Sequence, residues 1–166
     1  TWVFVPYCTG DLHAGTQTKI YDSLGPRTMH HVGAHNVDAM LAKVAALDPD
    51  EVFTIGVSAG GYGAQLNWDR IAAAFPGVTT HLLADGAQLV PIEWMRWGAI
   101  LGSWAPRFPA GCADCDEGLG RLAAHWNAGP PPGGGRHGLL ASLQDSTLAL
   151  FFGYDLPSLR SASLAV

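Results

Sequence analysis

The chain has 166 residues, of which 48% are hydrophobic and 14% are charged, and its formal net charge is −5. This length suffices for one domain with a hydrophobic core, and so apolar a composition excludes an intrinsically disordered chain. The negative charge argues against nucleic acid as a partner, and no apolar run reaches the length of a membrane span. We therefore expect a single domain over residues 1–166.

The first residues predict a strand and a polar loop. Residues 2–5 (Trp-Val-Phe-Val) are apolar, and the sequence shows neither an initiating methionine nor a signal-peptide pattern. Because a domain rarely opens inside a buried strand, we expect a segment before Thr1. The loop over residues 6–15 is polar and contains glycines, which is typical of loops that carry function on a rigid sheet.

A short strand and a helix are expected next. Residues 20–24 predict a weak strand. Apolar residues recur at helical spacing over residues 37–46, and Asn36 is the expected N-cap of that helix. The sequence Asp48-Pro49-Asp50 then ends the helix.

The segment Gly56-Val57-Ser58-Ala59-Gly60 is the strongest functional signal. The apolar residues 52–55 before it predict a buried strand, and residues 61–74 after it predict a helix. A sharp turn from strand to helix with serine at its apex is a nucleophile elbow. It would expose the Ser58 hydroxyl and direct the backbone amide of Ala59 at a developing oxyanion. An ordinary serine in a glycine-rich turn is the alternative.

The second half of the chain continues the alternation of strands and helices. Residues 78–84 predict a strand that ends in Asp85-Gly86, and residues 138–143 predict another strand, followed by a helix over 146–154. Between them, residues 91–136 form a cap-like excursion, with one or two short helices over 91–104, a helix over 119–126 and a Gly/Pro-rich loop over 129–135. This order predicts an α/β fold with a mostly parallel sheet and helices on both faces.

Cys112 and Cys115 form a Cys-x-x-Cys pair in a segment rich in Gly, Pro and charge. Such a pair can be a short disulfide, a redox centre or half of a metal site. No second Cys pair and no histidine at zinc-finger spacing accompany it, so we favour a structural disulfide. Such a disulfide is typical of an exported protein, and we therefore expect a secreted or periplasmic location. No cofactor is expected.

A serine nucleophile needs a histidine base and an acid that orients it. Asp85 and Asp145 both follow predicted strands, and we favour Asp145 because the acid of an α/β-hydrolase follows a later strand. A helix N-cap is the alternative role for Asp145, and a turn former is the alternative for Asp85. None of the seven histidines follows Asp145, so the catalytic histidine is expected beyond Val166, with His13 and His35 as fallback bases.

Several blocks of the sequence, in order up to about Tyr154, resemble the pectin acetylesterase and Notum carboxylesterase family. The blocks are residues 5–15 (Val-Pro-Tyr-Cys-Thr-Gly-Asp-Leu-His-Ala-Gly), 31–36 (His-Val-Gly-Ala-His-Asn), 56–64 around Ser58, 83–86 (Leu-Ala-Asp-Gly) and 142–146 around Asp145.

The resemblance implies an α/β-hydrolase-like fold, incomplete at both ends, and serine esterase chemistry. It gives Ser58 the role of nucleophile, Asp145 that of acid, and Ala59 that of one oxyanion amide. The family's Gly-rich oxyanion loop would lie before Thr1, and its histidine after Val166.

We therefore expect a carboxylic ester hydrolase of the O-deacetylase type, whose partner is a small-molecule or polysaccharide acyl ester. The alternative is a catalytically incomplete hydrolase fold that binds carbohydrate through Trp94, Trp97 and Trp104, although packing in the core is the more common role of buried tryptophans.

Overall fold

A parallel sheet of three strands is the centre of the fold. The computed structural model describes residues 1–23 and 25–165. Strands β3 (Glu51–Val57), β4 (Thr79–Asp85) and β5 (Gly134–Leu140) lie side by side in that order, and both pairs are parallel. Because consecutive parallel strands need long crossovers, helices connect them. The expected α/β class with a parallel sheet is confirmed at this level.

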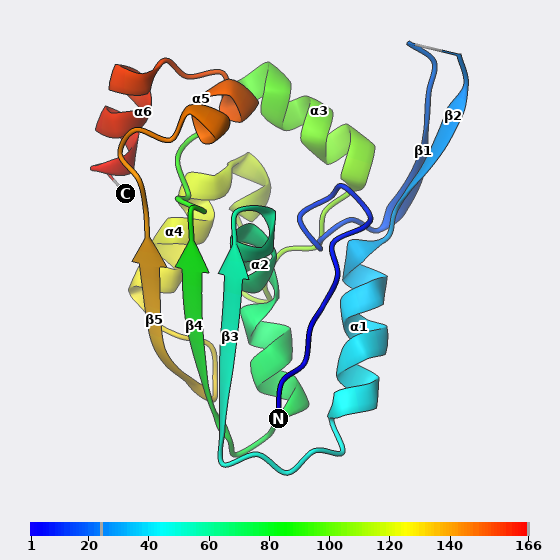
Figure 1. Ribbon diagram of the computed structural model, residues 1–166, viewed down its shortest axis with the longest axis vertical. Coiled ribbons are helices and arrows are strands. Elements are labelled where there is room, and N and C mark those ends of the chain that lie inside the picture. The colour runs from blue at the N-terminus through cyan, green and yellow to red at the C-terminus, as the bar shows by residue number, and fades with distance from the viewer. Residues whose placement is uncertain (24, 166) are drawn as a thin grey trace.

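Helix α2 (Ala59–Ala74) packs against one face of this sheet. The residues of β4 alternate, so that Thr80, Leu82 and Ala84 are buried toward the helix. Figure 1 shows the sheet in front of α2 and of α4 (Leu119–Ala128). The buried Trp68 of α2 contacts Trp126 of α4, with ring centroids 5.2 Å apart, and this contact joins the two helices behind the sheet.

The opposite face of the sheet is open. Phe53, Ile55 and Val57 of β3 are 64%, 57% and 66% exposed, and no helix of the described residues covers them in Figure 1. The expectation of helices on both faces is therefore wrong for the described chain. Alternation of strand and helix in the sequence predicts parallel pairing, but it does not decide on which face each helix packs.

The excursion over residues 91–136 packs into the same core as the sheet. It contains α3 (Trp94–Trp104), a 3₁₀-helix over Cys115–Glu117 and α4. Trp97, Leu119 and Trp126 belong to one buried cluster with Leu82 of β4. Cys112 and Cys115 form a disulfide whose Cα atoms lie 5.5 Å apart, while Cys8 is free and exposed.

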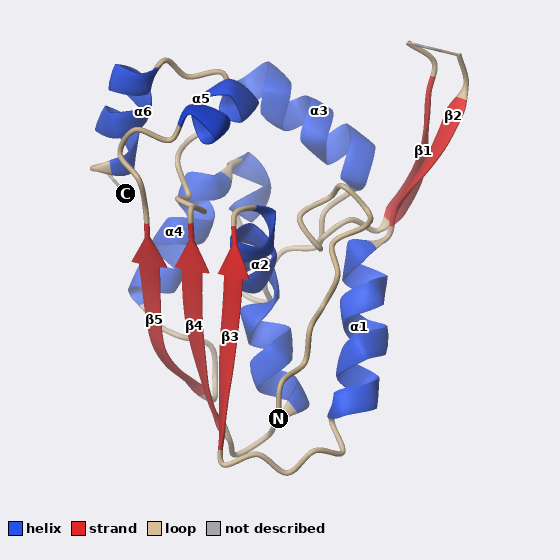
Figure 2. Cartoon of the chain, in the orientation of Figure 1, coloured by secondary structure: helices blue, strands red, loops and turns tan. Residues whose placement is uncertain are grey.

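The first part of the chain differs from the expected strands. Residues 2–5 form a loop, drawn tan in Figure 2, because no strand of the described residues pairs with them. An antiparallel hairpin of β1 (Gln17–Tyr21) and β2 (Arg27–His31) follows and extends away from the sheet. It replaces the single strand expected over residues 20–24, of which Leu24 lies outside the described residues.

A buried carboxylate determines where α1 (Gly33–Val44) begins. The Gly33 N–H donates to Asp11 Oδ2 at 2.7 Å, so the helix starts before the expected N-cap Asn36. Asp11 Oδ1 accepts from Thr9 Oγ1 at 2.6 Å and from the His13 N–H at 3.1 Å. Asp11 is fully buried, and its role as a cap from a distant loop is invisible to local sequence patterns.

The last elements shift by a few residues from their expected bounds. Pairing with β4 begins β5 within the Gly/Pro-rich loop, at Gly134, and ends it at Leu140. Helix α5 (Ser146–Phe152) ends at Gly153, whose φ of 80° suits a left-handed C-cap. Helix α6 (Leu156–Ser163) then closes the described chain. Among all the described residues, no helix has the length and apolarity needed to cross a membrane.

Replacement of Asp11 by alanine should strongly destabilise the fold. Asp11→Ala leaves three buried donors without an acceptor, and we expect the free energy of unfolding to fall by about 3 kcal/mol or more. Urea denaturation measures this loss. Asp22, an exposed residue that directly follows β1, serves as the control, and Asp22→Ala should change the free energy by less than about 0.5 kcal/mol. Equal stability of the two variants would contradict the assigned role of Asp11.

Candidate active site

Ser58 occupies a strained turn between β3 and α2. It is the single residue between Val57, which ends the strand, and Ala59, which begins the helix. Its backbone has φ 52° and ψ −119°, a region that residues other than glycine rarely adopt. The Ser58 side chain is exposed at the carboxyl edge of the sheet. The geometry is that of the turn predicted from the sequence.

Two close approaches of the backbone explain the glycines around Ser58. A Cβ atom on Gly56 would overlap the carbonyl oxygen of Gly60, so the strand and the first helical turn can meet only because Gly56 has no side chain. A Cβ on Gly61 would lie 2.6 Å from Cβ of Ala87, in the segment after β4. Gly60 itself has open space, so the two positions that require glycine are Gly56 and Gly61.

The hydroxyl of Ser58 is not used to cap the helix. Serine at this position usually accepts a hydrogen bond from an early helical N–H, yet Ser58 makes no such bond. The first N–H groups of α2, including that of Ala59, have no acceptor within the helix. An exposed hydroxyl therefore lies beside backbone donors and the positive end of the helix dipole.

Asp145 lies at the same edge of the sheet, at the start of α5. Its Oδ1 accepts from the Leu148 N–H at 2.9 Å, so Asp145 is the N-cap of that helix. Its Oδ2 faces Gly86, 3.9 Å from the place where a Cβ of Gly86 would lie. Capping therefore uses one carboxylate oxygen and leaves the other directed at the end of β4.

The end of β4 links Ser58 and Asp145. The Ser58 N–H donates to the carbonyl of Asp85 at 2.7 Å, and Asp145 approaches the next residue, Gly86. The charge of Asp145 also reaches Tyr62, one turn into α2: burial, and then the Asp145 carboxylate, raise the pKa of the Tyr62 hydroxyl far above its ordinary value. The two predicted residues thus flank one strand end.

Asp85, the other candidate acid, lies on the open face of the sheet. Its side chain points to the face opposite that of the buried Ala84, because successive side chains of a strand alternate between faces. In the sheet, Asp85 pairs with Val57 and Leu140. Its backbone carbonyl, rather than its carboxylate, contacts Ser58.

Neither fallback histidine is hydrogen-bonded to Ser58 among the described residues. The ring of His13 packs against Gly63, where a Cβ would lie 2.5 Å from its Cδ2 atom, and against Tyr7 at a centroid distance of 4.8 Å. His35 is exposed in the first turn of α1. Within the described residues no hydrogen bond joins Ser58 to a histidine, and His13 serves packing.

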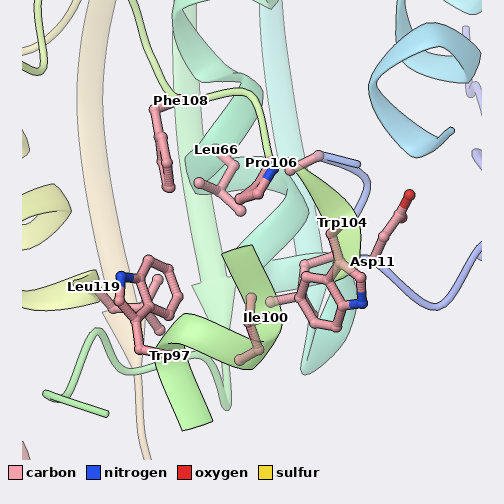
Figure 3. Close-up of a pocket in the computed structure, with 10 residues that line it drawn as sticks. Asp11, Leu66, Trp97, Ile100, Trp104, Pro106, Phe108 and Leu119 are labelled. Atoms are coloured by element: carbon pink, nitrogen blue, oxygen red, sulfur yellow. The ribbon is translucent and has the colours of Figure 1, made fainter. Parts of the chain in front are cut away.

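Only one of the three α3 tryptophans is strongly exposed. Trp97 is buried and its indole N–H donates to the Asp116 carbonyl at 2.6 Å, while Trp104 lies 6.1 Å from the ring of His31. Figure 3 shows Trp97 and Trp104 beside a small apolar pocket between α3 and the body of the domain. Trp94, at 77% exposure, alone remains free to stack on a ligand.

The structure adds residues that the sequence did not single out, namely Asp11, Tyr62 and Gln88. Gln88 is a polar residue in an apolar stretch, and this pattern could have marked it in the sequence, whereas the roles of Asp11 and Tyr62 depend on distant contacts.

The residues that the structure describes contain no group of three or more His, Cys, Asp or Glu side chains arranged to hold a metal ion. Comparison of the sequence with protein-family models and with curated proteins gives no match.

The strain at Ser58 can be measured by comparing two substitutions. Because glycine tolerates a positive φ and alanine does not, Ser58→Gly should unfold with a free energy about 1 kcal/mol higher than Ser58→Ala. Urea denaturation of both variants gives the difference. The control is Ala39→Gly on the exposed side of α1, where glycine should instead cost about 1 kcal/mol relative to the native alanine. A lower stability of Ser58→Gly than of Ser58→Ala would show that the turn is unstrained.

Burial of His13 should make the fold less stable in acid. Burial lowers the pKa of His13 from its ordinary 6.5, against a smaller opposing effect of the Asp11 charge. The unfolded chain then binds more protons than the folded one, so the free energy of unfolding should rise with pH up to about 6.5. Urea denaturation from pH 4.5 to 8 measures this dependence.

His13→Gln should flatten that dependence, whereas the exposed His35→Gln should leave it unchanged. An identical pH dependence in His13→Gln and the wild type would contradict the inferred shift.

Proposed function

We propose that this protein is a serine hydrolase of carboxylic esters with an α/β-hydrolase-like fold. The observation that carries the proposal is the state of Ser58: exposed, held at positive φ between a strand and a helix, and free of any capping bond. Strain of this kind costs about 1–3 kcal/mol and persists where it serves a function. An ordinary turn would have used a glycine or a serine that caps the helix.

In the proposed reaction the Ser58 Oγ attacks the acyl carbon of an ester while a histidine takes its proton. The carbonyl oxygen gains the negative charge, and the Ala59 N–H donates to it, a type of contact worth about 3 kcal/mol in the transition state. The tetrahedral intermediate then expels the alcohol, which receives the proton from the imidazole. Water attacks the acyl-enzyme in the same way, which releases the acid and restores Ser58.

Asp145 is the proposed acid that orients the histidine. One of its carboxylate oxygens is fixed by the Leu148 N–H, so the other is held in a defined direction over Gly86. An acid that is anchored by a helix cap needs little reorganisation when an imidazolium forms beside it. The histidine itself is proposed only from the family resemblance of the sequence.

The resemblance also supports the substrate class, O-acetyl or similar esters of small molecules or polysaccharides. The disulfide between Cys112 and Cys115 supports an oxidising location, secreted or periplasmic.

The test uses the full-length protein with a small acetyl ester and an acyl-phosphonate probe. Ser58→Ala should lower kcat by about 1,000-fold or more, because the nucleophile is lost while the fold is kept. Ser161→Ala, at an exposed serine of α6, should retain wild-type turnover. Mass spectrometry should locate the probe on Ser58. Equal turnover of wild type and Ser58→Ala would refute the esterase, and glycan binding without probe reaction would instead favour a carbohydrate-binding module.

A further inference from the structure

A buried glutamine lies between the nucleophile helix α2 and the acid loop, which we define as residues 141–145 between β5 and α5. Gln88 follows β4 by three residues and is 1% exposed. Neither the proposed reaction nor the motifs of the sequence assign it a role. A glutamine so completely buried needs a reason, because burying an amide is unfavourable unless its groups are hydrogen-bonded.

The backbone on either side of Gln88 is attached to α2. The Tyr62 N–H donates to the carbonyl of Ser58 at 3.1 Å, in the first turn of the helix, and the Tyr62 hydroxyl donates to the carbonyl of Gln88 at 2.8 Å. Gln65, further along the same helix, donates from Nε2 to the carbonyl of Ala87 at 2.8 Å. Residues 87 and 88 therefore move with the helix that carries Ser58.

The side chain of Gln88 extends this attachment to the acid loop. Its Nε2 donates to the carbonyl of Ser142 at 3.1 Å, three residues before Asp145. Since a carbonyl can only accept, the amide must present its nitrogen to Ser142, and its orientation is fixed. Oε1 is then left buried with no donor in the described chain. The buried Oε1 of this amide thus lowers stability, while its Nε2 binds the acid loop.

We propose that Gln88 is a positioning residue that holds Asp145 in register with Ser58. The hydrogen-bonded path runs from Ser58 through Tyr62 and Gln88 to Ser142, so a shift of the acid loop is resisted by the same helix that presents the nucleophile. The orphaned Oε1 indicates that this amide is kept for the loop and not for stability. The inference rests on the proposed function for its catalytic part, and on the contacts alone for its structural part.

Gln88→Met tests the proposal, because methionine has a similar shape and no hydrogen-bond donor. The variant loses the bond to Ser142 together with the orphaned oxygen, so its global stability should equal or exceed that of the wild type. Hydrogen exchange of the amides of residues 141–148 should become about fivefold faster, the factor that corresponds to one ordinary hydrogen bond. Exchange within α2 should not change.

The catalytic part is measured in the full-length protein by the rate at which an acyl-phosphonate modifies Ser58. Gln88→Met should slow this rate by about 10- to 100-fold per folded molecule, as expected for a misplaced catalytic group. Gln17→Met is the matched control: Gln17 also donates from Nε2 to a backbone carbonyl, that of Gly102, but it lies in the hairpin. Its probe rate and the exchange of residues 141–148 should remain as in the wild type.

Gln88→Glu gives an independent check through pH. The introduced carboxyl can donate to Ser142 only when it is protonated, so the probe rate of this variant, relative to wild type, should fall as pH rises. A purely structural role of Gln88 would lower the stability of Gln88→Glu as the buried carboxyl ionises, but it would leave the probe rate per folded molecule, relative to wild type, independent of pH.

The outcomes separate the two proposals. A wild-type protein that does not react with the probe refutes the proposed function, whereas the exchange data still report on Gln88. A reactive wild type with unchanged rate and unchanged exchange in Gln88→Met refutes the role of Gln88. A loss of stability in Gln88→Met together with a normal probe rate per folded molecule refutes it as well.

Discussion

The close contact between the end of β3 and the first turn of α2 is the constraint on which the site depends. The Gly56 backbone meets that of Gly60, and the chain can reverse in so small a space only if the intervening residue takes a positive φ. Ser58 is that residue. Its side chain is exposed at the end of the strand, beside the first N–H groups of the helix. Strand, glycine contact and helix together produce an exposed hydroxyl in a donor-rich place.

The carboxyl edge of the sheet gathers the other components. The N–H of Ser58 bonds to Asp85, Gly86 lies beneath Asp145, and Gln88 joins α2 to the acid loop. All three contacts arise within a few residues of the end of β4. The end of β4, the central strand, therefore contacts both the Ser58 turn and the acid loop, which are far apart in sequence. In open parallel sheets, sites form at this edge for the same reason.

A second centre of organisation lies in the loop before the hairpin. Asp11 gathers donors from its own loop and from the start of α1, and Gly15 and Gly33 approach its carboxylate so closely that a side chain on either would collide with it. The loop in turn packs His13 on Gly63 of α2. These contacts of Asp11 and His13 fix the position of α1 against α2. The polar residues of this loop therefore have a structural role, whereas the candidate site is formed by residues at the strand ends.

The sequence by itself determined the elements whose signals are local. The apolar residues before Ser58, the glycines around it and the helical pattern after it predict the turn, since steric exclusion acts between neighbours in the chain. The strand before Asp85-Gly86 and the helix after Asp145 were predictable for the same reason, whereas the choice of Asp145 over Asp85 as the acid stays a prediction.

Only the tertiary structure decided the rest. The start of α1 depends on Asp11, a carboxylate from another loop, and the bounds of β5 depend on its register with β4. The exposure of Phe53 and the burial of Trp97 depend on which surfaces of the elements pack together. No local sequence pattern determines this. The link through Gln88 joins residues 54 positions apart. Contacts of that range form only when the chain has folded, because they depend on packing and not on the preferences of adjacent residues.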